Sequence, residues 1–298
     1  MMPSLLFILS ATLMYSAPLV FAALGGVISE RSGVINIGIE GMMVIGAFAA
    51  TTTAHFTGNP WLGFVFGGLA GGILALLHAV ACVFLKADQT ISGVAMNLIG
   101  PGLSMFLCGV LFDGNSTTTP IKNKLPKILV GSDIDIASLM SLLLSVLIWF
   151  VFSSTKWGLR VRAVGENPAA ADSLGISVSK IRVFSVILSG ILAGFGGSAI
   201  TLGIVTQFSS SCVAGQGFMA LSALIFGKWK PFNTYLACLF FGFAQVLSIT
   251  LNSGSESVLP PVILAILPYL LTISVLIFFV GKSVAPKANG VPYEKSML

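Results

Sequence analysis

The chain has 298 residues, of which 56% are hydrophobic and only 8% are charged, and its formal net charge is +5. A membrane-spanning helix needs about 20 mainly apolar residues, and runs of this kind follow one another along the chain, which excludes a soluble globular protein. The basic residues lie in short loops at the ends of the apolar runs, so the positive charge does not indicate nucleic-acid binding.

Nine apolar runs predict an all-α fold, a polytopic membrane helical bundle of about nine helices (eight to ten) in a single transmembrane domain, 1–298. No loop between the runs is long enough for a second globular domain. The N-terminal segment lacks a basic n-region and contains Pro3 and Pro18, so we expect a membrane helix rather than a cleaved signal peptide. The predicted spans are 5–29, 33–53, 61–85, 90–112, 137–155, 181–206, 212–227, 231–251 and 258–280.

The first turns of the second predicted span contain Asn36 and Glu40. A charged residue at the centre of a membrane helix costs about 2.5–3.5 kcal/mol on insertion scales, and residues four apart share a helix face. The pair therefore indicates either a polar stripe along a pathway or a broken helix, or else a glutamate bonded to a neighbouring helix for packing. The sequence leaves these readings open.

Glycines four residues apart lie in the third and sixth predicted spans. In lipid, such glycines let two helix backbones approach closely, so we expect them to pack helices together. The pairs are Gly67 with Gly71, Gly68 with Gly72, and Gly190 with Gly194.

The charges predict the orientation in the membrane. With the predicted spans, Lys122, Lys124 and Lys127 fall on one side, in the polar loop 113–136, and all other basic residues fall on the other. Cytoplasmic loops carry the excess of Lys and Arg, so we expect the C-terminus in the cytoplasm and the N-terminus outside. The loop 113–136 is too short for a ligand-binding domain, although it could contact an external protein.

The segment 156–182 is rich in basic residues and contains a short helix with its own end signals. Asn167 can cap the N-terminus, Pro168 suits the first helical position, and Gly175 suits the position after the end. A small capped helix on the cytoplasmic side of a membrane protein predicts a docking element for a soluble partner.

Two stretches of the sequence resemble each other. Residues 40–43 read EGMM and residues 216–219 read QGFM, and each stretch is preceded by a Gly-Gly pair and followed by a proline. The predicted topology runs the two copies in opposite directions, which is typical of transporters built from inverted repeats. Chance similarity between two glycine-rich segments is the alternative.

No catalytic constellation appears in the sequence, and we predict no metal site and no cofactor bound by this chain. The four cysteines are isolated, and His78 is expected to be a hydrogen-bonded core residue. Residues 281–283 read GKS, but position 276 is Leu rather than the Gly that a phosphate-binding loop requires. If ATP drives this protein, a separate subunit must bind the ATP and its magnesium.

Three motifs together resemble a known family. They read GVINIGIEGMM at 33–43, SGVAMNLIG at 92–100 and GLRVRAVGENPAAADSLGI at 158–176. They are similar to permease subunits of bacterial ABC importers for branched-chain amino acids, simple sugars and nucleosides, and most similar to the nucleoside branch. The resemblance runs from about residue 15 to 245. It implies a type II-like importer fold in the bacterial plasma membrane.

The resemblance also implies partners and an alternating-access mechanism. The partners are a second permease, a paralogue or otherwise a second copy, a cytoplasmic ATPase that is often a fused double ATPase, and an external substrate-binding lipoprotein. A nucleoside presents hydroxyls and a flat base, which amide and aromatic side chains suit. The predicted pathway residues are Asn36, Glu40, Asn97, Phe106, Gln216 and Phe218. The predicted ATPase contacts are Arg160, Arg162, Glu166, Asn167, Pro168, Ala171 and Gly175.

Other functions fit parts of the same pattern. An importer for ribose, another simple sugar or a branched-chain amino acid would share the family motifs. An ion-coupled secondary transporter would need a cation site in the membrane, for which Glu40 alone is thin support. A membrane-embedded enzyme would need an acid–base or metal cluster.

Overall fold

A computed structural model describes residues 5–128, 134–252, 270, 273–274, 277 and 284–294. The ninth predicted span, 258–280, lies outside these residues apart from four positions. The described chain is helical, as the sequence predicts, and six of its helices are long and apolar enough to cross a membrane. The helices are α1 Leu5–Arg31, α2 Ile39–Thr57, α3 Pro60–Ala79, α4 Gln89–Leu111, α5 Ile136–Ser154, α6 Lys156–Glu166, α7 Pro168–Ser173, α8 Val178–Ala199, α9 Gln216–Phe226 and α10 Pro231–Asn252, and the π-helical turns η1 Val80–Phe84 and η2 Ile200–Val205 extend α3 and α8.

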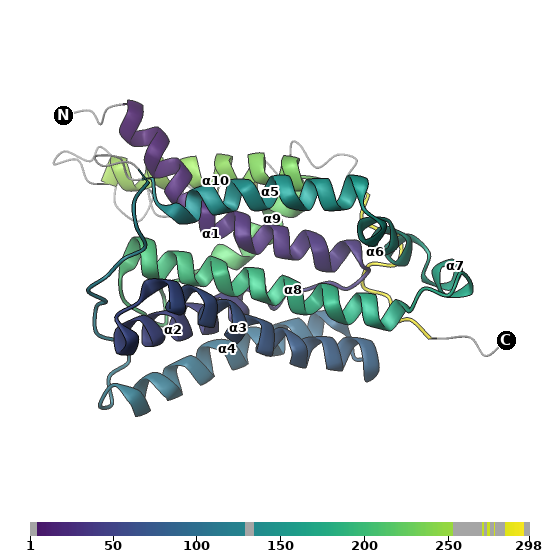
Figure 1. Cartoon of the computed structure of the whole chain (residues 1–298), viewed down its shortest axis with the longest axis horizontal. Coiled ribbons are helices and arrows are strands. Elements are labelled where there is room, and N and C mark those ends of the chain that lie inside the picture. The colour runs from purple at the N-terminus through teal and green to yellow at the C-terminus, as the bar shows by residue number, and fades with distance from the viewer. Residues whose placement is uncertain are drawn as a thin grey trace.

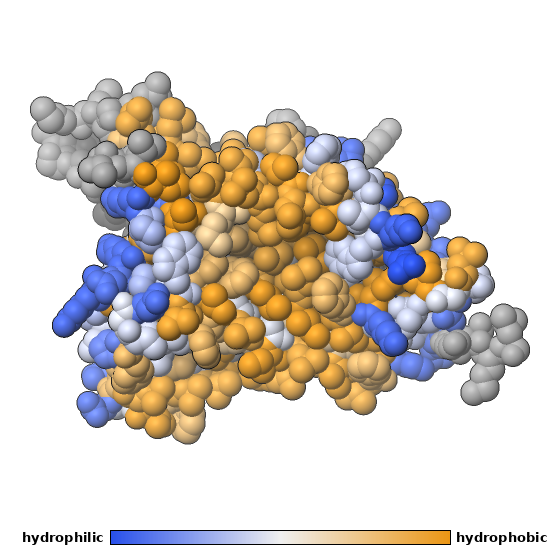
Figure 2. All heavy atoms as spheres, viewed as in Figure 1, coloured by the Kyte–Doolittle hydropathy of each residue, from blue (hydrophilic) through white to orange (hydrophobic). Residues whose placement is uncertain are grey.

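The long helices run side by side along one axis (Figure 1). Helix α8 packs against α1, α2 and α3, while α10 and α5 pack on α1, and α4 packs on α2. Helices α6 and α7 lie at one end of the bundle, here called the α7 end, and the loop 112–128 lies at the opposite end. Figure 2 shows apolar residues across the middle of the bundle and hydrophilic residues gathered at both ends, as a membrane requires.

The crossing of α3 and α8 is made of glycine, as the spacing of these residues predicts. A Cβ atom on Gly71 would overlap the backbone of Gly190, and one on Gly194 would overlap the backbone of Gly67. A Cβ on Gly68 would in turn collide with the ring of Phe195. Close backbone approach replaces the hydrophobic effect as the source of helix association in lipid, so these glycines hold the centre of the bundle together.

Two of the predicted spans are broken. The span predicted at 33–53 becomes helical only at Ile39, after a non-helical stretch at 32–38. The continuous span predicted at 212–227 is wrong, because α9 has 11 residues, about 16 Å, and a crossing needs about 30 Å. The preceding backbone cannot be helical, since Thr206, Ala214 and Gly215 all have positive φ.

The segment predicted as a loop at 156–182 is largely helical. Helix α6 begins directly after α5, at Lys156, and α8 already starts at Val178. The side chain of Thr155 accepts a hydrogen bond from the Gly158 N–H at 3.2 Å, which caps α6. The short predicted helix is confirmed as α7, so this end of the bundle consists of two surface helices in sequence.

Candidate functional site

Helix α7 has the end signals that the sequence predicts. The Asn167 side chain accepts a hydrogen bond from the Ala170 N–H at 3.1 Å, and Pro168 occupies the first helical position. Gly175 follows with a φ of +79°, a conformation that glycine adopts without strain. The result is one rigid helical turn and a half at the outermost point of the α7 end (Figure 1).

The exposed face of α7 is not the one that carries Ala171. Ala171 is buried and packs with Val164 and Val178, so it anchors α7 to the bundle. The side chain of Leu174, by contrast, is 80% exposed. Arg160 and Glu166 on α6 are exposed, whereas Arg162 is half-buried and lines a pocket beneath α6. Leu174, directly after α7, is therefore an exposed large apolar side chain at this end of the bundle.

The C-terminal residues 284–294 lie across the α7 end, which the sequence did not predict. The Ala288 N–H donates to the carbonyl of Gly165 at 2.9 Å, and Arg182 Nη1 donates to the carbonyl of Val291 at 2.9 Å. An ion pair of 2.7 Å joins Lys86 to Glu294. Residues 284–294 thus connect α6, α8 and the end of α3.

A buried carboxylate strengthens this connection. Glu30, in the last turn of α1, accepts a hydrogen bond from the Trp229 indole at 2.6 Å and one from the Asn289 side chain at 3.2 Å. Glu30 is 6% exposed, and its neighbour in sequence is the basic Arg31. An acid beside a helix end gives no periodic signal, so only the folded chain identifies this contact.

The second structural centre lies inside the bundle, where α2 and α9 both begin. Glu40, in the first turn of α2, accepts a hydrogen bond from the Gly215 N–H at 2.7 Å and one from the Gly217 N–H at 2.6 Å. These N–H groups belong to the N-terminus of α9, where the helix dipole favours a negative charge. Glu40 therefore caps α9 at a helix end that lies inside the bundle.

Asn97 binds the backbone at the start of α2, as Glu40 binds the backbone at the start of α9. Its Oδ1 accepts a hydrogen bond from the Gly41 N–H at 2.8 Å, and its Nδ2 donates to the carbonyl of Ile37 at 2.9 Å. Gln89 accepts from the Ile35 N–H at 2.7 Å, and His78 contacts the carbonyl of Ile35 at 3.0 Å. Non-helical backbone at membrane depth needs such partners, so these side chains stabilise the break before α2. The prediction that His78 is a hydrogen-bonded core residue is confirmed.

The structure gathers some of the predicted pathway residues and separates others. Glu40, Asn97 and Gln216 are half-buried around the starts of α2 and α9, and Phe218 follows on α9 with half of its surface exposed. Asn36 is fully buried on another side and donates to Ser189 Oγ at 3.0 Å. Phe106 is exposed on α4, about 13 Å along the helix from Asn97.

Comparison with known proteins identifies the family. The chain matches the family described as branched-chain amino acid transport system / permease component over residues 8–279. It belongs to this family.

Among its relatives, the guanosine ABC transporter permease protein NupQ of Bacillus subtilis is 44% identical and the alignment covers 97% of this permease and 96% of NupQ. The nucleoside ABC transporter permease protein NupC of Lactococcus lactis is 41% identical, with 97% of each chain covered. A relative from Haloferax volcanii that is named "Putative glucose ABC transporter permease protein TsgC13" is 34% identical, and the alignment covers 92% of this permease and 91% of that relative. Bacillus subtilis and Lactococcus lactis also have more distant relatives of this chain, the permease proteins NupP and NupB respectively, each 26% identical to it.

Proposed function

We propose that this permease conducts nucleosides across the bacterial plasma membrane as one of two permease subunits of an ATP-driven importer. The observation that carries the substrate class is the identity of 41–44%, over almost the full length, to permeases of guanosine and nucleoside transporters. The glucose permease relative is more distant, at 34%. A simple sugar is therefore the less favoured substrate class.

The permease itself takes no part in ATP hydrolysis. Its sequence lacks a phosphate-binding loop, so ATP and its magnesium bind to a separate ATPase, which we expect to be a fused double subunit. Helix α7 is the element that receives the movement, because it protrudes at one end and is directly followed by the exposed Leu174. Arg160, Glu166 and Gly175 flank the docking surface, and Ala171 fixes it to the bundle.

The broken helices support an inverted repeat, with α1, α2 and α3 related to α8, α9 and α10. A Cβ on Gly25 of α1 would lie 2.6 Å from the carbonyl oxygen of Ser189, and one on Gly196 of α8 would lie 2.8 Å from that of Pro18. Gly25 and Gly196 are separated in sequence by the same number of residues as Pro18 and Ser189. Such a pair of contacts is what a two-fold relation between the two segments would produce. With the apolar run 258–280, the full permease would have about nine membrane segments.

The substrate pathway in this proposal runs between the two permeases and past the point where α2 and α9 begin. Glu40, Asn97 and Gln216 supply polar groups there, and Phe218 offers an exposed ring beside them. Asn36 and Phe106 lie further away and would contribute through packing or at another depth. Inward and outward states would differ in how the half-helix α9 is exposed.

The partners follow from the same family. NupQ and NupP, and likewise NupC and NupB, are pairs of unequal permeases in one bacterium, which supports a paralogue rather than a second copy as the other subunit. The excess of basic residues at the α7 end supports a cytoplasmic position for that end and for the C-terminus. The N-terminus and the loop 112–128 would then face the external binding lipoprotein.

Uptake in a deletion strain tests this proposal. Deleting the gene should abolish uptake of radiolabelled guanosine and other nucleosides at submicromolar concentration, and a plasmid copy should restore it. Glucose, ribose and leucine serve as comparison substrates in the same strain. Loss of sugar uptake with nucleoside uptake unchanged would contradict the proposal and favour the sugar alternative.

A further inference from the structure

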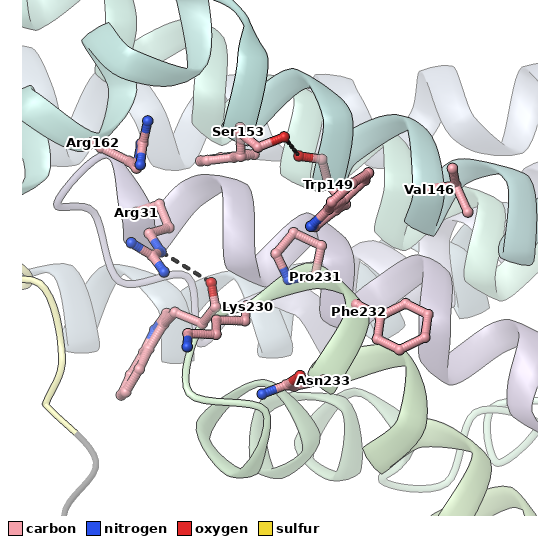
Figure 3. A pocket seen from close by; sticks show the side chains of 11 residues that line it. Arg31, Val146, Trp149, Ser153, Arg162, Lys230, Pro231, Phe232 and Asn233 are labelled. Atoms are coloured by element: carbon pink, nitrogen blue, oxygen red, sulfur yellow. Dashed lines mark hydrogen bonds between the residues drawn. The ribbon is translucent and has the colours of Figure 1, made fainter.

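A pocket of about 690 Å³ opens on the side of the bundle at the α7 end. It lies between α5 and α10, beside the last residue of α1 and beneath α6 (Figure 3). Three cationic side chains, Arg31, Arg162 and Lys230, lie at one end of the pocket. The other end is formed by apolar side chains of α5 and α10, which are Val146, Trp149 and Phe232.

The cations of the pocket have few partners within the described residues. Arg31 Nε donates to the carbonyl of Trp229 at 3.0 Å, and this hydrogen bond does not use the two terminal nitrogens of the guanidinium group. The Nε of Arg162 is buried without a hydrogen-bond partner in the part of the chain that the structure describes. No acidic residue lines the pocket, although Arg31 also interacts with Glu166 outside it. The pocket therefore has an excess of positive charge that an anion would neutralise.

The apolar wall determines what kind of anion fits. Val146, Trp149 and Phe232 are each about half exposed, and they lie on helices that cross the membrane. Val146 is about 12 Å along α5 from the end of that helix. A ligand that bridges both parts must have a negative head at the membrane surface and an apolar chain that extends toward the bilayer centre. Basic pockets between membrane helices on the cytoplasmic side bind lipid head groups in this way.

We propose that this pocket binds an anionic phospholipid of the surrounding membrane. Its phosphate lies among Arg31, Arg162 and Lys230, and one acyl chain packs on Trp149, Phe232 and Val146. Because Arg162 is on α6, directly before α7, the bound lipid fixes the base of the docking helix. A soluble partner does not fit as well, because the apolar wall faces sideways at the depth of the hydrocarbon. The assignment holds for any substrate of the permease.

Lipid binding to the purified full-length permease in detergent tests the proposal. Native mass spectrometry would compare palmitoyl-oleoyl phosphatidylglycerol with the matching phosphatidylcholine. The test variant is Arg162→Gln with Lys230→Gln, and the control is Lys122→Gln with Lys124→Gln at the opposite end. We expect the wild type and the control to prefer phosphatidylglycerol, and the test variant, which lacks two charges, to bind it about thirtyfold more weakly. Binding of phosphatidylcholine should not change.

Further measurements distinguish a lipid phosphate from free inorganic phosphate, and single variants replace the double variant if it does not fold. Trp149→Ala should weaken binding of phosphatidylglycerol while leaving the charge intact, and Lys230→Gln alone, at an exposed position, keeps the test open if the double variant does not fold. Full competition by millimolar inorganic phosphate would overturn the proposal, since it would identify a free-anion site. So would equal binding of both lipids by the wild type, or an equal loss in the control variant.

Discussion

Replacing Glu40 by glutamine should release the N-terminus of α9. The carboxylate accepts hydrogen bonds at 2.7 Å from the Gly215 N–H and at 2.6 Å from the Gly217 N–H, and each hydrogen bond to a charged group contributes about 1.5–3 kcal/mol. A glutamine of the same size keeps one acceptor oxygen but places its NH₂ group against the second N–H. The substitution therefore costs about 2–3 kcal/mol of local stability.

Amide hydrogen exchange measures this loss where it occurs. Because 1.4 kcal/mol corresponds to a factor of ten, the amides of residues 215–217 should exchange about 30- to 150-fold faster in Glu40→Gln. Glu166→Gln is the matched control, since Glu166 is exposed on α6 whereas Glu40 lies at the N-terminus of α9. Exchange in 215–217 that changes less than twofold, with the peptide otherwise protected, would refute the assignment of Glu40 as the cap of α9.

Three other predictions follow from the geometry. Gly71→Ala should lower the free energy of unfolding of the purified protein by about 1–3 kcal/mol, because the new Cβ would overlap the backbone of Gly190. Gly102→Ala on α4, where a Cβ has open space, is the control and should change the free energy of unfolding little. Leu174→Asp should abolish substrate-stimulated ATP hydrolysis and uptake while membrane insertion stays normal, and full stimulation of ATP hydrolysis in this variant would exclude α7 as the docking element. Asn167→Ala should lower the stability of α7 by about 0.5–2 kcal/mol. Lys124→Cys should react with a membrane-impermeant thiol reagent in intact cells, whereas Lys228→Cys should react only after permeabilisation, and the reverse pattern would invert the orientation.

Local sequence signals predicted the parts of this structure that depend on local chemistry. Asn167, Pro168 and Gly175 mark the ends of α7 because a cap, a first-turn proline and a left-handed glycine each act within a few residues. The packing role of the glycines of α3 and α8 is equally predictable from the sequence, since their four-residue spacing places them on one helix face. The apolar runs located the long helices because the bilayer sets their length.

The rest depends on contacts between distant segments. The run 212–226 contains mostly apolar and small residues, so its hydropathy does not reveal that Ala214 and Gly215 adopt positive φ and break the span. The isolated Glu40 marked a special position, but its partner was a backbone 175 residues away. Residues 284–294 carry no periodic pattern, and their attachment through Glu30 and Arg182 appears only in the folded chain.

The burial of Ala171 is a smaller example of a contact that the local sequence does not predict. The sequence placed this residue in a short docking helix but could not say which face of that helix meets the bundle. With six residues, α7 is too short for a periodic apolar stripe to settle the question. The packing of Ala171 on Val164 and Val178 settles which face of α7 meets the bundle, and Leu174 is the exposed apolar side chain beside it.

The most direct test of the account is ATP-driven nucleoside accumulation by the purified complex. The tagged permease would be isolated from its host membrane with the subunits that accompany it, reconstituted in liposomes, and supplied with the external binding protein and radiolabelled guanosine. The account predicts accumulation when ATP and magnesium are present on the side of the α7 end, no accumulation with ADP, and no effect of ionophores that collapse proton and sodium gradients. Accumulation driven by an ion gradient without ATP would contradict it and identify a secondary transporter.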